Sequence, residues 1–147
     1  MVVTNSQVEE VLAAIQQPFP ALTELSIWWE DGMLEDETHP VVPESFLGGS
    51  APRLQDLSLK RVSFRGLPNL LLSATHLVIL YILDIPHSGY FSPETMVRCL
   101  STMTRLRSLE LGFKFPLSRP VRESRRPRPP TRSILLTLTY FVFLRGQ

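Results

Sequence analysis

The stretch Ala51–Val62, APRLQDLSLKRV, sets a pattern that recurs along the chain. Its three leucines, Leu54, Leu57 and Leu59, have the spacing L-x-x-L-x-L. Apolar side chains occur at this spacing four more times, as Leu22, Leu25 and Ile27; Leu77, Leu80 and Ile82; Leu106, Leu109 and Leu111; and Leu138, Phe141 and Phe143. A strand-forming block repeated every few tens of residues predicts stacked units that bury their apolar faces against one another.

The intervals between these five apolar triplets indicate the type of repeat. Their first residues are 32, 23, 29 and 32 residues apart, whereas leucine-rich repeats run about 20–29 residues. The asparagine usual three residues after the last triplet position is replaced by Glu30, Val62, Ile85 and Lys114, so the coils should be irregular. We predict an α/β leucine-rich-repeat solenoid with parallel strands on the concave side and short helices and loops on the convex side.

The segments around the triplets predict the domain organisation. Residues 1–17 should form a capping helix or the convex-side helix of a repeat whose strand lies outside the chain. Residues 18–118 contain the first four repeats, with short helices over 44–47, 66–73 and 93–101 and a solvated acidic loop over 30–43. Residues 119–132 predict a disordered arginine- and proline-rich insertion, and residues 133–147 a fifth, terminal repeat strand.

Charge is distributed very unevenly along the chain. Residues 1–52 carry nine acidic side chains and no Lys or Arg, whereas residues 53–147 carry fifteen basic and five acidic ones, so the two parts stand at −9 and +10. In a solenoid this makes one end acidic and the other basic, and head-to-tail attraction between molecules is one consequence.

Five segments carry a resemblance to a known family. They are FPALTELSIWWED, PESFLGGSAPRLQDLSL, GLPNLLLSATHLVIL, IPHSGYFSPETMVRCLSTMTRLRSLELGF and RPVRESRRPRPPTRSIL. Together they resemble the leucine-rich region of a large group of fungal F-box-type proteins, over about residues 18–144. In that family an F-box recruits a ubiquitin-ligase adaptor and the repeats present a substrate. No F-box-like segment occurs among the seventeen residues before the first repeat, so the chain looks like a fragment of the repeat region.

Side chains that alternate with the triplet residues should form the concave sheet face. Among these, the candidate partner-binding residues are Trp28, Lys60, Ile79, Tyr81, Glu110 and Tyr140. Exposed aromatic side chains are typical anchors for protein partners. We therefore expect a non-catalytic protein–protein interaction module, as in the substrate-recognition part of an F-box-type ubiquitin-ligase receptor. The alternatives are that missing repeats or another domain cover this face, or that the chain is a repeat fragment without activity of its own.

The arginine- and proline-rich segment offers a second kind of partner. Its basic residues are Arg119, Arg122, Arg125, Arg126, Arg128 and Arg132. Clustered arginines neutralise phosphates, but the segment lacks the interleaved aromatics that stack on bases. A solvated loop is favoured over nucleic-acid binding, with nuclear import or docking of an acidic partner left open. The apolar strand SILLTLTYFVFL predicts self-association through its edge.

Other chemistry finds little support in the sequence. No residue set has catalytic spacing, so we expect no enzymatic activity and no cofactor. His39 beside Glu35, Asp36 and Glu37 is more simply a solvated acidic loop than a metal site. Cys99 should be a buried, inert thiol, and a single cysteine favours a reducing compartment. Neither a signal peptide nor a membrane span is recognisable, so we expect a cytoplasmic or nuclear protein.

Overall fold

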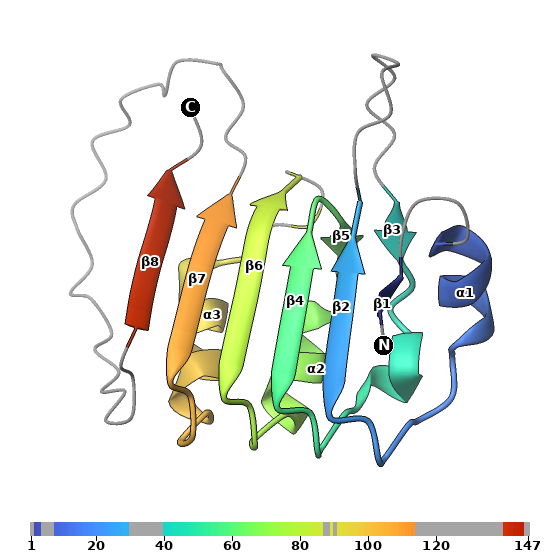
Figure 1. Cartoon of the computed structure of the whole chain (residues 1–147), viewed down its shortest axis with the longest axis horizontal. Helices are drawn as coiled ribbons and strands as arrows, with labels where there is room; N and C mark the ends of the chain where they lie inside the picture. Colours follow the sequence, from blue (N-terminus) through green and yellow to red (C-terminus); the bar gives the residue numbers. More distant parts are fainter. Residues whose placement is uncertain are drawn as a thin grey trace.

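Six parallel strands form one sheet in the computed structural model, which describes residues 2–3, 8–29, 40–86, 89, 91–113 and 140–145 (Figure 1). The strands lie in the order β1-β2-β4-β6-β7-β8. Their bounds are β1 Val2–Val3, β2 Glu24–Trp28, β4 Asp56–Lys60, β6 Ile79–Ile85, β7 Ser108–Phe113 and β8 Tyr140–Arg145. Five of the six contain the second and third residues of an apolar triplet, and these five are neighbours in the sheet.

The triplets align in register across the sheet. Their second residues form one row, Leu25, Leu57, Leu80, Leu109 and Phe141. Their third residues form the next row, Ile27, Leu59, Ile82, Leu111 and Phe143. The prediction that the triplets lie side by side in neighbouring parallel strands is therefore confirmed.

Two helices cover one face of this sheet and bury the triplets. Helices α2 (Leu67–Ser73) and α3 (Pro93–Ser101) lie behind the sheet in Figure 1. Their apolar residues share one core with the strand leucines, of which Leu57 and Leu80 are fully buried. Burying one such side chain contributes about 1.5–3 kcal/mol, so the leucine rows hold the two layers together.

Helix α3 has the predicted bounds, 93–101, and α2 begins one residue after the predicted 66 and ends at the predicted 73. Proline at the first helical position leaves no unsatisfied N–H there, and Ser92 caps α3 by accepting a hydrogen bond from the Thr95 N–H at 3.2 Å. In α2, the Ser73 hydroxyl donates to the Leu70 carbonyl at 2.7 Å and accepts from the Ala51 N–H at 3.0 Å. The helix end is thereby attached to the turn that precedes β4.

The turn before each strand repeats in detail. The N–H of the first triplet residue donates to the carbonyl three residues earlier, in the pairs Leu22–Phe19, Leu54–Ala51, Leu77–Ala74 and Leu106–Met103, at 3.0, 3.1, 3.2 and 3.3 Å. In the first three units, one carbonyl just after the turn accepts two N–H groups from the next unit. Gln55, for example, accepts from Val78 at 2.8 Å and from Ile79 at 3.0 Å. The four units therefore share backbone geometry as well as leucine spacing.

Part of the predicted acidic loop is instead a strand. Val41–Val42 form β3, which pairs in parallel with β5 (Ser63–Phe64) in a second, two-stranded sheet. Val42 is 1% exposed, so the prediction of a solvated loop is wrong for this end of the segment. Residues 30–39 lie outside the described part.

The N-terminal region holds both a helix and a strand. Helix α1 (Val8–Ala14) falls within the predicted capping helix, and its Leu12 is buried. Strand β1 was not predicted, and it pairs with β2 so that Val3 lies opposite Ile27. The helical turn expected at 44–47 is the 3-10 helix η1 (Phe46–Gly49). The predicted insertion at 119–132 and the start of the fifth strand before Tyr140 lie outside the described residues.

Candidate functional site

The sheet face opposite α2 and α3 carries the side chains that alternate with the leucines. Within the described ranges, no helix or strand covers this open face (Figure 1). Register partners form rows across it. One row, from β2 to β7, is Ser26, Ser58, Tyr81 and Glu110, and the next, from β2 to β6, is Trp28, Lys60 and Leu83. Strand pairing thus brings together side chains that are far apart in the sequence.

Large side chains on the open face remain accessible. Trp28 is 46% exposed, which is unusual for so large an apolar group. Lys60 is exposed, and Ile79, Tyr81 and Leu83 are half-buried. The face therefore combines accessible aromatic side chains, which are enriched at protein interfaces, with one cationic group.

A hollow of about 250 Å³ lies among these side chains. Trp28, Lys60, Tyr81 and Leu83 line it together with Ser58 and Leu59. Ser58 has a small side chain in the middle of β4, and its register partners are Ser26 on β2 and the larger Tyr81 on β6. Trp28 lies diagonally opposite Ser58, as the register partner of Lys60. The small Ser58 side chain leaves space among the larger Trp28, Lys60 and Tyr81 side chains, and the hollow has room for one apolar side chain of a partner.

Tyr81 is held in place by a neighbouring strand. Its hydroxyl lies 3.2 Å from Ser108 Oγ, and the two form a hydrogen bond between β6 and β7. This bond restricts the ring before any partner arrives. A side chain ordered in advance loses less entropy on binding, so Tyr81 is suited to be an anchor of the open face.

Two carboxylates lie side by side at the start of β2 and β4. Glu24 and Asp56 are register partners on the same face. Burial and the negative charge of Glu24 both raise the pKa of Asp56 above its ordinary value of 3.8. Like charges directly opposite in a sheet repel one another, so this end of the open face carries a concentrated negative charge.

The structure brings together three of the sequence-predicted site residues. Trp28, Lys60 and Tyr81 line the hollow. Ile79 and Glu110 lie on the same face outside it, and the strand position of Tyr140 is in register with Ser108. The six candidate arginines between 119 and 132 lie outside the described residues.

Ser58 and Leu83 also line the hollow, although sequence analysis did not select them as site residues. Both alternate with triplet leucines, so the sequence places them on the face. A small outward residue beside a large one on the next strand, such as Ser58 beside Tyr81, is the signal for a depression, and it becomes visible only when the strands are aligned.

The described part of the chain was searched for a metal-binding cluster and for a membrane-spanning helix. No group of three His, Cys, Asp or Glu side chains able to hold a metal ion occurs there. The His39 group lies outside it. Cys99 is buried, as predicted, and its thiol donates to the Pro68 carbonyl at 3.6 Å. None of the helices in the described ranges is long and apolar enough to cross a membrane.

Comparison of the chain with protein-family models, with curated proteins and with solved structures finds no match.

Proposed function

We propose that this chain is a leucine-rich-repeat solenoid that binds a protein partner through the open face of its sheet, without catalysis. The observation that carries the proposal is the hollow between Trp28 and Tyr81, on a face that none of the described helices covers. The repeated turn hydrogen bonds and the aligned triplets support the repeat assignment. The ubiquitin-ligase role implied by the resemblance stays a prediction.

The composition of the hollow favours a protein partner over a small ligand. Trp28 and Tyr81 supply aromatic surface, Leu83 supplies aliphatic surface, and Lys60 adds a positive charge at the rim. Tryptophan and tyrosine are enriched among residues that dominate binding energy at protein interfaces. A volume of about 250 Å³ is below the roughly 300–1,000 Å³ of typical small-molecule pockets.

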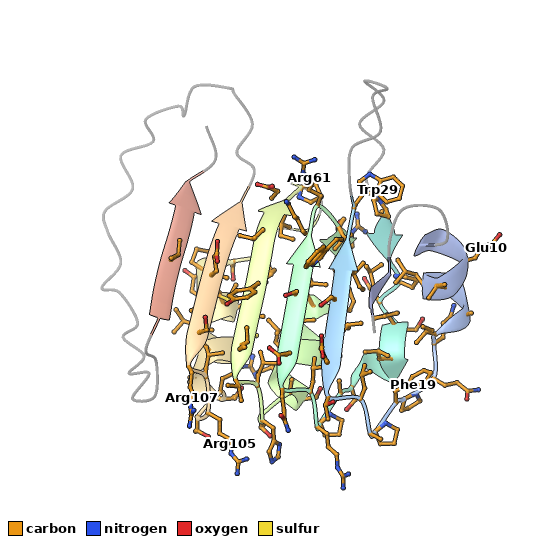
Figure 2. The ribbon with its side chains drawn as sticks, viewed as in Figure 1. Glu10, Phe19, Trp29, Arg61, Arg105 and Arg107 are labelled. Atoms are coloured by element: carbon orange, nitrogen blue, oxygen red, sulfur yellow. The ribbon has the colours of Figure 1, made fainter. Side chains whose placement is uncertain are left out.

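Matched alanine variants test this proposal. Trp28→Ala and Tyr81→Ala remove the walls of the hollow, whereas Phe19→Ala removes an apolar side chain that is equally exposed, at 46%, and lies away from the hollow (Figure 2). Wild type and each variant are immobilised, and the proteins that they capture are quantified by mass spectrometry. The affinity of each variant for the purified partner is then measured. Loss of an interface anchor costs about 2 kcal/mol, or roughly thirtyfold in Kd.

The expected result is one partner retained by wild type and Phe19→Ala and lost by both hollow variants. Circular dichroism of each variant shows whether its fold is intact. A partner that binds all folded variants equally would contradict the proposal.

A second candidate is self-association, favoured by the position of β8. In the described sheet, β8 pairs with β7 alone, and an edge strand offers unpaired backbone groups to another chain. Sedimentation velocity at increasing concentration tests this. Replacing Val142, on β8, with proline should weaken any assembly formed through this edge, since proline removes a backbone N–H donor.

A further inference from the structure

A row of basic side chains follows the edge at which the strands begin, which we call the strand-start edge. Arg53, His76 and Arg105 each stand one residue before the first position of a triplet, and all three are exposed. Arg107 is exposed at the same edge, and Figure 2 shows it and Arg105 pointing away from the sheet. The repeat therefore places basic groups from three units along one line.

The spacing within this row follows from the turns. The same turn hydrogen bond closes all three turns, so equivalent positions lie on neighbouring strands. His76 Nδ1 is 3.1 Å from the Pro52 carbonyl oxygen, which places adjacent turns in contact. Neighbouring strands are about 4.8 Å apart, so the backbone positions of Arg53 and Arg105, two strands apart, are separated by about 10 Å.

A second hollow opens beside two of these arginines. It measures about 460 Å³ and is lined by Val78, Thr104, Arg105 and Arg107. The Val78 carbonyl accepts the Arg107 N–H at 2.8 Å, which fixes the Arg107 backbone next to β6. The hollow thus has one apolar wall and two guanidinium groups on its rim.

The local charge at this hollow is positive. Strands β6 and β7 begin with Ile79 and Ser108, so neither places a carboxylate at the strand-start edge. By contrast, β2 and β4 begin with Glu24 and Asp56. The strand-start edge therefore carries Glu24 and Asp56 as well as Arg53 over β2 and β4, and basic side chains over β6 and β7.

We propose that the strand-start edge over β6 and β7 binds an acidic segment of a partner protein, with its carboxylates on Arg105 and Arg107. Guanidinium groups hold carboxylates through paired hydrogen bonds, and Val78 offers apolar contact. None of the four lining residues is aromatic, which disfavours single-stranded nucleic acid, because its binding depends on base stacking.

The test uses a fluorescein-labelled octaglutamate peptide, with binding followed by fluorescence anisotropy at low salt. All variants are made in a full-length chain in which the six arginines between 119 and 132 are replaced by glutamine, so that these arginines do not compete for the peptide. Arg105→Glu/Arg107→Glu is compared with Arg65→Glu/Arg98→Glu, which changes the net charge equally at two other exposed arginines. Exposed ion pairs contribute up to about 1 kcal/mol each, so we expect about tenfold weaker binding for the first variant and less than about twofold for the second.

Three results would overturn the proposal. The first is that the chain with the six glutamines fails to bind the peptide. The second is that both charge variants weaken peptide binding equally. The third is that a single-stranded oligonucleotide binds more tightly than the peptide and that Arg105→Glu/Arg107→Glu abolishes this binding. If circular dichroism shows that the charge reversal unfolds the chain, Arg105→Gln/Arg107→Gln replaces it, with Arg65→Gln/Arg98→Gln as control. The hollow at Trp28 takes no part in this experiment, so failure here leaves the proposed function standing.

Discussion

Arg61 and Asp84 form an ion pair between equivalent positions of two neighbouring strands, with Arg61 Nε 3.6 Å from Asp84 Oδ2. Arg61 directly follows Lys60 and Asp84 directly follows Leu83, and Lys60 and Leu83 are register partners. Both have left-handed backbones, with φ of 57° and 50°. The next residues, Val62 and Ile85, are buried, and the register of β6 shifts between Ile82 and Ile85 before Ile85 pairs with Phe113. Apolar side chains thus stand inside the turn where typical repeats carry asparagine.

We expect backbone conformation to matter more at Asp84 than its ion pair, because both side chains are partly exposed. A left-handed non-glycine residue costs about 1–2 kcal/mol, and aspartate and asparagine tolerate it best. Asp84→Ala should therefore lower the free energy of unfolding by about 1 kcal/mol, and Asp84→Asn by less than about 0.5 kcal/mol. Urea denaturation measures both, and equal losses would show that the ion pair dominates.

Replacing Glu24 should stabilise the fold at neutral pH. Glu24 raises the pKa of Asp56, so the folded state holds this proton more tightly than the unfolded chain does. Stability therefore falls as pH rises from the ordinary value of 3.8 through the raised folded-state value. Glu24→Gln should add about 0.5 kcal/mol at pH 7, a value reduced by solvent screening.

This gain should disappear at about pH 3, where the Asp56 carboxyl is protonated in both states. Glu10→Gln, at an exposed position on α1, is the control and should change stability by less than about 0.3 kcal/mol. A Glu24→Gln gain that is the same at pH 3 and pH 7 would show that repulsion from Asp56 is not its cause.

Cys99 should react only when the chain opens. Burial raises the pKa of its thiol, against a smaller lowering effect of Arg98, and the side chain is fully buried. Because the thiolate is the reactive form, labelling by a disulfide reagent should be about a hundredfold slower in the native chain than in urea. Ser101→Cys in a Cys99→Ala background places a thiol at an exposed position of the same helix. This control should label rapidly, and equally rapid labelling of native Cys99 would be inconsistent with a closed core.

Gly66 should tolerate no side chain. An added Cβ would lie 2.9 Å from both the Glu44 carbonyl oxygen and Phe64 Cε2, so Gly66→Ala must displace backbone or an aromatic ring. We expect a loss of about 2 kcal/mol in unfolding free energy. Gly49 has φ of 71° and open space around it, so Gly49→Ala should cost only the backbone strain of about 1 kcal/mol. A smaller loss at Gly66 than at Gly49, in thermal or urea unfolding, would contradict this packing.

The sequence predicted those parts of the fold that depend on local pattern. Leucine spacing alone placed Leu57 and Leu80 in adjacent parallel strands, because only one register aligns all the triplets. Ser92 and Pro93 located the start of α3 for a similar reason, since a cap is written in neighbouring residues. Residues with local, repeated signals were therefore assigned correctly.

What was missed depends on contacts between distant segments. Strand β3 is only two residues long, and its pairing with β5 is a tertiary contact with no periodic signal. The left-handed turn at Asp84 likewise follows from burial of Ile85 in the core. At the site, outward residues were predicted from alternation, but the hollow over Ser58 depends on relative sizes across three strands.

Spin labels on the open face test most directly whether the triplet strands are parallel neighbours in register. Nitroxides at Ser26→Cys and Ser58→Cys, in a Cys99→Ala background, occupy register partners on β2 and β4, about 4.8 Å apart along the backbone. Labels at Ser26→Cys and Glu110→Cys lie three strands apart in the same row, or about 14 Å. The alignment predicts strong dipolar broadening for the first pair and much weaker broadening for the second. Equal broadening in the two pairs, or none in the first, would contradict it.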